Sequence, residues 1–287
     1  MTGKNIPLLL LAILLYTSTQ AQPYLDAVQT VYETSPGGDP EQFSHFRASA
    51  NIPLVMKDSS IFVINPIWED RWIKIYEQSE QVHLRGFITW LTYSRKIATN
   101  WSAMIAFIPR WNGQPQIQFS EGFQAGGAML FTYQKKPELQ FKFGVYFNNE
   151  FYGLRFIPLL GLDWTISKSQ RIFGVLPGYM VYENRISKRF AWGANFRTFT
   201  NSYKLSSDYP MPPQVNFMRI DDNQLGPYVD VYLLPRIVLN AEAGYSILRK
   251  VRTGYGKTSS DEYNVLSDNS APYIRVALQY RLRLDKN

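Results

Sequence analysis

The chain has two histidines and no cysteine, which restricts the chemistry that its side chains can perform. His45 and His83 are the candidates for a general base, and a hydrolase would need one of them beside a serine or a carboxylate. Ser44 precedes His45, but neighbours in a strand point to opposite faces, so this adjacency makes no dyad. The sequence also lacks the G-x-S-x-G, H-E-x-x-H and P-loop motifs. We therefore expect both histidines at a rim or in a loop, and we assign no catalytic residue.

Metal and cofactor sites are not predicted either. The lack of cysteine excludes thiolate metal sites, disulfides and a lipid-modified N-terminal cysteine. Asp221-Asp222-Asn223 offers the oxygen ligands that calcium prefers, but not the ligand spacing of an EF-hand loop, so a turn in a solvated loop is the better interpretation. Gly37-Gly38 and Gly126-Gly127 have no phosphate-binding context and suit a turn and the interior of a strand.

A third group of candidate residues carries charge at positions that alternate with apolar side chains. Inside a barrel such residues would face the lumen, where they could select ions or hold a substrate. They could also simply pair with one another across a filled interior, because buried charges must be paired, and we prefer this interpretation. The residues in question are Asp163, Asp230, Glu242, Arg197, Arg275 and Arg281.

The elements that must position these residues are strands with a period of two. From Ala271 to Leu284 one face is apolar (Ile274, Val276, Leu278, Tyr280, Leu282, Leu284) and the other carries three arginines. A membrane-spanning strand needs about 9–11 tilted residues, so this segment is long enough to be the closing strand of a barrel. The same alternation is clear at 100–111, 138–148, 155–166, 190–200 and 236–248, and weaker at 25–34, 43–53, 59–67, 84–95, 121–134 and 224–234.

The connections between these strands are of two kinds. Five are short and polar or carry proline (96–100, 135–138, 167–170, 187–189 and 234–236), and four are long (68–83, 111–121, 201–223 and 250–270). This asymmetry is typical of short periplasmic turns and long extracellular loops. A single strand cannot start and end on the same side of the membrane, yet the turns 167–170 and 187–189 both look periplasmic. A tight hairpin must therefore lie within 171–186, at Pro177-Gly178, which gives fourteen strands. If 171–186 crosses once and 25–34 is not a strand, the count is twelve. We prefer fourteen.

The composition and the N-terminus predict an exported membrane protein. Apolar residues make up 45%, aromatic residues 15% and charged residues 18%, with a net charge of +7. Aromatic girdles are typical of transmembrane barrels, so we expect Trp101, Trp111, Trp164 and Trp192 to be interface anchors on the lipid face; core tryptophans of a soluble sandwich are the alternative. A signal peptide is predicted over 1–21, cleaved after Ala21, from Lys4, the apolar stretch 6–15 and the small residues at Thr19 and Ala21. One barrel domain then covers 22–287. The alternative for the N-terminal segment is a membrane anchor or a buried helix. The basic charge comes without a nucleic-acid motif, so nucleic acid is not an expected partner.

A resemblance supports the same class. The segment PLLGLDWTISKSQRIFGVLPGYMVYENRISKRFAWGANFRTFT (Pro158–Thr200) resembles a Bacteroidota family of outer-membrane β-barrels classed as a domain of unknown function. The similar parts are GLDW, RIFGVLP, the Y…IS-KR turn and GANFR. The resemblance implies the fold and a Gram-negative outer membrane, and it supplies no functional residues. The chain departs from the usual pattern because it does not end on an aromatic residue, so Tyr280 would have to take that role.

We therefore expect an all-β, up-and-down antiparallel transmembrane barrel of unknown substrate. The first hypothesis is a narrow pore, a small-solute transporter or a structural barrel, whose partners are outer-membrane lipid, barrel-assembly machinery and periplasmic chaperones. Bulky residues at Tyr146, Leu159 and Tyr232 leave open whether the lumen conducts. The second hypothesis is an enzyme acting on lipid or peptide, which needs a histidine dyad at the rim. The third is a secreted soluble β-sandwich or lectin.

Overall fold

The structure, a computed structural model, describes residues 24–35, 42–74, 81–207, 215–256 and 264–283. The predicted signal peptide (1–21), Gly37-Gly38 and Leu284 lie outside these residues. The strands are β1 (Tyr24–Thr34), β2 (Gln42–Ala50), β3 (Ile52–Val55), β4 (Ile61–Lys74), β5 (Val82–Ala98), β6 (Trp101–Gly113), β7 (Phe123–Lys136), β8 (Leu139–Glu150), β9 (Gly153–Thr165), β10 (Gln170–Leu176), β11 (Tyr179–Arg185), β12 (Phe190–Lys204), β13 (Phe217–Leu234), β14 (Ile237–Gly254), β15 (Asn264–Ser267) and β16 (Ala271–Arg283), and one short helix is α2 (Phe119–Gly122).

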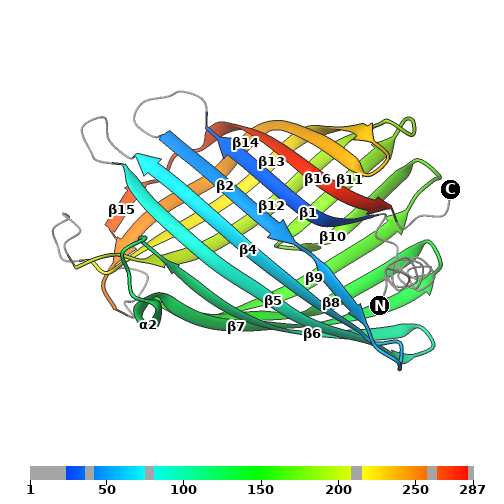
Figure 1. The fold of residues 1–287 in the computed structure, drawn as a ribbon, viewed down its shortest axis with the longest axis horizontal. Coiled ribbons are helices and arrows are strands. Elements are labelled where there is room, and N and C mark those ends of the chain that lie inside the picture. Colours follow the sequence, from blue (N-terminus) through cyan, green and yellow to red (C-terminus); the bar gives the residue numbers. More distant parts are fainter. Residues whose placement is uncertain (1–23, 36–41, 75–80, 208–214, 257–263, 284–287) are drawn as a thin grey trace, which may run out of the picture.

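The strands form one closed antiparallel barrel (Figure 1). Consecutive strands pair along the chain, and β16 pairs with both β14 and β1, which closes the ring. β3 continues β2 beyond Asn51 and pairs with β4, while β15 is a short strand that pairs with the last residues of β14. Fourteen strands therefore make the wall, as preferred from turn phase. Closure leaves neither terminal strand with an unpaired edge, which is the condition for a sheet to cross lipid.

The alternation of the closing strand is confirmed. Ile274, Val276, Leu278 and Tyr280 point outward and are exposed, whereas Tyr273, Gln279 and Arg281 are buried inside. Other strands expose an apolar outer face in the same way, as at Phe107, Phe156 and Leu160. A surface of this kind suits the hydrocarbon core of a bilayer. Within the described residues, no helix has the length and apolar character needed to cross a membrane.

The four tryptophans predicted on the lipid face differ in their surroundings. Trp164 and Trp192 are exposed outward, and Trp101 packs against Tyr133 with ring centroids 4.9 Å apart. Trp111 is buried instead, because the segment that carries α2 covers it and the carbonyl of Gln118 accepts a hydrogen bond from its indole at 3.3 Å. The prediction of an exposed interface residue is therefore wrong for Trp111.

The tight hairpin predicted at Pro177-Gly178 is present between β10 and β11. These two strands have seven residues each, so pairing stops at Leu160 on β9 and at Arg197 on β12. Thr198 fixes the hairpin to β12, with its hydroxyl donating to the carbonyl of Pro177 at 2.6 Å and its amide to that of Gly178 at 2.9 Å. Beyond this point β12 continues with no ladder partner on its β11 side.

All four predicted long loops contain strand, which corrects their boundaries, and β6 extends to Gly113. β4 runs to Lys74, β12 to Lys204 and β14 to Gly254, and β13 already begins at Phe217. These strand ends lie at the end of the barrel with the longer loops, which we call the loop end; the opposite end, with the short turns, is the turn end (Figure 1). Here β12, β13 and β14 pack across the barrel onto β2, β4 and β5. Their contact, the loop-end cluster, consists of Phe43, Ile73, Val82, Leu84, Tyr203, Leu205, Val215, Met218, Ile220 and Val251.

The loop end of β12 bends across the barrel together with β13, with which it stays paired as far as Lys204. Lys204 pairs in parallel with Gly113 of β6, although five strands lie between β12 and β6 in the ring. The amide of Gln114 also donates to the carbonyl of Lys204 at 3.0 Å. Residues 198–204 of β12, here called the β12 crossing, therefore lie over the lumen with apolar side chains packed beneath the loops. The loop-end cluster and the β12 crossing therefore join opposite walls at this end of the barrel.

Candidate functional site

The lumen is the candidate site because its charged side chains gather there in buried networks. Period-two alternation places them inside, since every second residue of each strand must face the lumen when the others face lipid. Small residues make room for them. A Cβ on Gly86, for example, would lie 2.8 Å from both Asn112 Oδ1 and Glu69 Cγ, so only glycine allows these two side chains to cross that point.

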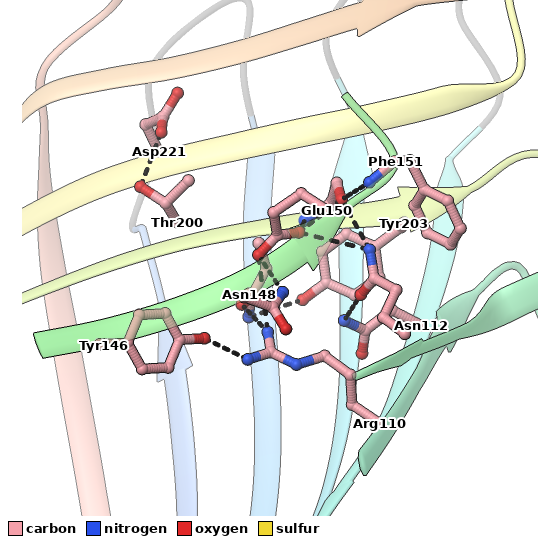
Figure 2. Close-up of polar contacts among 12 residues, drawn as sticks. Arg110, Asn112, Tyr146, Asn148, Glu150, Phe151, Thr200, Tyr203 and Asp221 are labelled. Atoms are coloured by element: carbon pink, nitrogen blue, oxygen red, sulfur yellow. Dashed lines mark hydrogen bonds and ion pairs between the residues drawn. The ribbon is translucent and has the colours of Figure 1, made fainter. Parts of the chain in front are cut away.

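One network ties the β12 crossing to the opposite wall (Figure 2). The hydroxyl of Ser202 donates to Glu150 of β8 at 2.6 Å, and the Ser202 amide donates to the same carboxylate at 3.2 Å. Asn148 also donates to Glu150, at 2.6 Å. Arg110 of β6 lies 3.7 Å from Glu150 and donates to the hydroxyl of Tyr146. The side chains of Glu150 and Arg110 are each at most 4% exposed, so this network is internal.

A second network surrounds Glu69 of β4. Its carboxylate accepts hydrogen bonds from the hydroxyl of Tyr203 at 2.6 Å, from Arg71 at 3.3 Å and from Asn201 at 3.4 Å. His45 Nε2 lies 3.5 Å away. Arg71 completes the group by donating to the Tyr203 hydroxyl at 2.9 Å. The β12 crossing is thus held to β4 as well as to β8.

The position of His45 corrects the sequence analysis. It was expected at a rim or in a loop, but it is buried on the lumen face of β2, beside Glu69. The register explains this, because Phe43, His45 and Arg47 share the inward face of that strand. A hydroxyl is not among the hydrogen-bond partners of His45 within the described residues.

The predicted lumen charges are confirmed inside the barrel, and they pair with one another. Glu242 of β14 accepts hydrogen bonds from Arg197 and from the hydroxyl of Tyr273, and Arg275 lies 3.8 Å from it. Gln224 of β13 extends this group, because its side-chain amide donates a hydrogen bond to Glu33 of β1. A carboxylate with two arginines and a phenol around it has little capacity left for another cation.

Near the turn end the remaining predicted residues form ion pairs of the same kind. Arg281 lies 2.5 Å from Asp230 and 2.6 Å from Asp26, with its guanidinium over the ring of Tyr24 at 3.6 Å. Asp163 lies 2.6 Å from Lys142. Arg283 of β16 reaches Glu183 of β11 at 2.8 Å, over a sequence separation of 100 residues. These predicted lumen charges are therefore held in ion pairs.

Asp221 and Asp222 are not in a solvated turn, which corrects that prediction. Both lie on β13. Asp222 is buried, accepts a hydrogen bond from Ser246 at 2.5 Å and lies 3.4 Å from Arg249; Asp221 is paired with Arg219 at 2.9 Å. Basic partners leave no place for calcium here, and within the described residues no three histidine, cysteine, aspartate or glutamate side chains gather as a metal site would require.

His83 does lie near the rim, on the outer face of β5. Its Nε2 is 2.7 Å from Asp70 of β4, and its ring stacks on Trp72 with centroids 5.1 Å apart. Asp70 also accepts hydrogen bonds from the indole of Trp68 at 2.6 Å and from Arg85 at 2.8 Å. The histidine–carboxylate pair that an enzyme would need is present, but its hydrogen-bond partners within the described residues include no serine or threonine.

Sequence reasoning missed several residues that form these networks. Glu69 and Arg71 were placed in a loop, because the alternation of β4 there is masked by aromatic residues on the outer face. The signal that could have found them is the continued period of two from Ile67 through Ile73, with inward residues Ile67, Glu69, Arg71 and Ile73. Arg47, Arg110 and Glu150 were within or next to predicted strands, but only the pairing across the lumen distinguishes them from surface charges.

Comparison with known proteins gives one family and several distant structures. The sequence matches a family described as a domain of unknown function, DUF6268, over residues 86–281. Among curated proteins none matches the chain significantly. Similar solved structures include the NanC porin (10% identity, 89% of this chain and 100% of that chain, TM-score 0.41) and LpxR from Salmonella typhimurium (6%, 88% and 99%, 0.37). The TodX monoaromatic hydrocarbon channel deltaS2 mutant also matches (9%, 91% and 91%, 0.36).

Proposed function

This chain belongs to the DUF6268 family of unknown function, and we propose that it is an outer-membrane barrel that passes a small polar solute through a lumen closed at rest. The observation that carries this proposal is the β12 crossing, which spans the lumen and is bonded to β4, β6 and β8. A purely structural barrel would need no such crossing, since closure of the wall already satisfies its edges. The polar interior beneath it suits a hydrated solute.

The bonds that tie the β12 crossing to β4, β6 and β8 are few, whereas its ladder with β13 runs without a break from Thr198 to Lys204. Ser202 and Tyr203 contribute hydroxyl groups to Glu150 and Glu69, and their removal leaves the charges of the lumen unchanged. Each buried hydrogen bond of this kind contributes about 1–3 kcal/mol. Displacing residues 198–204 together with the end of β13 that pairs with them would open the loop end, while the fourteen strands stay paired between Thr198 and the turn end. We therefore assign these bonds to the closed state of the passage.

Single-channel recording in a planar bilayer tests the proposal. We expect the unmodified protein to be mostly closed and the double variant S202A/Y203F to open more often, since both lost hydroxyl groups stabilise the crossing. The matched control is S167A/Y280F, which removes the same atoms at an exposed turn and on the outer face. Silence of the S202A/Y203F variant, in a protein shown to be folded by its heat-modifiable gel mobility, would contradict a passage and favour a structural barrel.

An enzyme acting on lipid or peptide remains the second candidate, and the observation that favours it is the His83–Asp70 pair on the outer face. There it would meet a lipid headgroup rather than a solute in the lumen. The test is hydrolysis of lipid or peptide substrates by the folded protein, comparing H83A with R85Q, which alters the same cluster but keeps the histidine. Activity that R85Q retains and H83A loses would establish this function in place of the passage.

A further inference from the structure

The middle of the lumen contains more positive than negative side chains. We define the central belt as the charged residues that surround Glu69 and Glu242: Arg47, Arg71, Arg197 and Arg275 with Glu33, Glu69 and Glu242. The strand registers bring them together, because Arg275 lies opposite Glu33, Glu33 opposite His45, and His45 opposite Arg71 on successive strands. With His45 neutral, the central belt has one cation in excess.

The excess charge is located at Arg47 of β2. The register places Arg47 directly opposite Glu69, which would be its natural partner. Glu69, however, already accepts hydrogen bonds from Arg71, Tyr203 and Asn201. On its other side Arg47 faces Val31, which is buried and apolar. The two neighbouring strands therefore offer it no free acceptor.

Arg47 makes no hydrogen bond or ion pair with any described residue, and its Nε is buried without a partner. Glu69 attracts its guanidinium electrostatically, but Arg71 and Arg197 repel it, and Arg47 and Arg197 in turn repel Arg275. Arg71 is paired with Glu69, and Arg197 and Arg275 share Glu242. Arg47 is partly exposed to the lumen while its Nε is buried and unbonded, so a ligand can reach its guanidinium, and an anion there would offset the cost of the excess charge.

We propose that Arg47 is the anion-binding residue of the lumen and that its ligand is a small oxyanion, a carboxylate or a phosphate. A guanidinium offers parallel N–H donors that match two oxygens of such a group, and the neighbouring arginines favour its charge. The ligand would neutralise the one charge that the protein leaves unpaired in the central belt. This inference gives the proposed passage its solute class, but binding at Arg47 can be measured whether or not the barrel conducts.

The test uses the folded full-length protein in detergent, with the ionic strength held constant in chloride. The midpoint of thermal unfolding is measured as chloride is replaced by acetate or by inorganic phosphate. Because a ligand that binds only the folded state stabilises it by mass action, we expect a saturable rise in the midpoint with at least one of these anions. The anion that produces the rise distinguishes a carboxylate ligand from a phosphate ligand.

Variants assign the rise to Arg47. R47Q should weaken the apparent affinity by about tenfold or more, and R47K should retain part of it because the charge remains. The matched control is R95Q on exposed Arg95 near the turn end of β5, which should respond like the unmodified protein. If R47Q fails to fold, V31E replaces it: a carboxylate opposite Arg47 should fill the site from within and abolish the response.

The proposal is overturned if neither anion raises the midpoint of the unmodified protein, or if R47Q and V31E respond as it does. Its failure is distinguishable from that of the proposed passage. Anion binding in a barrel that never conducts would keep the site and contradict the passage. Conductance by S202A/Y203F in a protein without an anion response would support the passage and contradict the anion site.

Discussion

Individual charges in this lumen are stabilised only by their partners, and Arg281 is the clearest case. It is 2% exposed and joins Asp230, which is fully buried, to Asp26. The substitution R281M should lower the free energy of unfolding by about 3–5 kcal/mol, because it leaves a buried carboxylate without its cation. Urea unfolding in lipid vesicles, followed by tryptophan fluorescence, measures this loss.

The control for Arg281 is R95M, which removes the same group from an exposed position and should cost less than about 1 kcal/mol. The double variant R281M/D230N should recover part of the loss, since it removes the uncompensated charge as well as its partner. Equal losses in R281M and R95M would show that the turn-end pairs contribute little and that lumen water solvates Asp230.

At the scale of elements, the β12 crossing decides whether the lumen is open. The chain has no cysteine, so a pair introduced at Gly113 and Lys204, which are register partners in the closed state, can be oxidised without side reactions. We expect G113C/K204C to form a disulfide readily, because paired strands bring the two Cα atoms within bonding range. Planar-bilayer recordings should show conductance that falls on oxidation and returns on reduction.

The matched pair for this crosslink is G113C/K136C, since Lys136 lies at the turn end of β7, on a different strand and at the opposite end of the barrel from Gly113. It should not form a disulfide, and its conductance should not respond to oxidant. If G113C/K204C crosslinks fully and conductance stays unchanged, solute does not pass beneath the β12 crossing, and the passage must lie elsewhere or not exist.

The elements also show how far sequence patterns reach. The β10–β11 hairpin was predicted from turn phase alone, because consecutive antiparallel strands must alternate direction. The ends of β4, β12, β13 and β14 lie in predicted loops, because an apolar outward face is the pattern from which the strands are predicted. Above the apolar band that face becomes polar or is covered by neighbouring segments, as at Phe217, and the criterion fails although hydrogen-bonded pairing continues.

At the scale of the whole molecule, the outer surface should behave as a lipid-facing band. Leu160 and Leu154 both point outward from β9 and are 67% and 59% exposed, but Leu154 lies nearer the loop end. We expect L160R to destabilise the barrel in lipid by about 2–4 kcal/mol and L154R by about 0–1 kcal/mol, because the cost of a charge on the lipid face depends on its depth. Unfolding in vesicles measures both.

Two results would contradict this view of the surface. Equal costs for L160R and L154R would mean that the two positions are at the same depth, so that the bilayer does not follow the apolar band. Negligible costs for both, together with solubility after detergent removal, would instead favour a secreted soluble protein. Heat-modifiable gel mobility of each variant confirms that a closed barrel is being compared.

The amino-acid pattern was sufficient to predict a closed barrel and the inward position of residues such as Glu242 and Arg281. It could do so because a period of two and the requirement that backbone groups be paired in lipid act locally along the chain. Tertiary structure alone decided which charges meet. Arg71 and Tyr203 are 132 residues apart and touch only because β12 bends across the lumen. That bend also occupies Glu69 and leaves Arg47 without a partner, since the number of acceptors around a buried charge depends on packing across the barrel and not on sequence spacing.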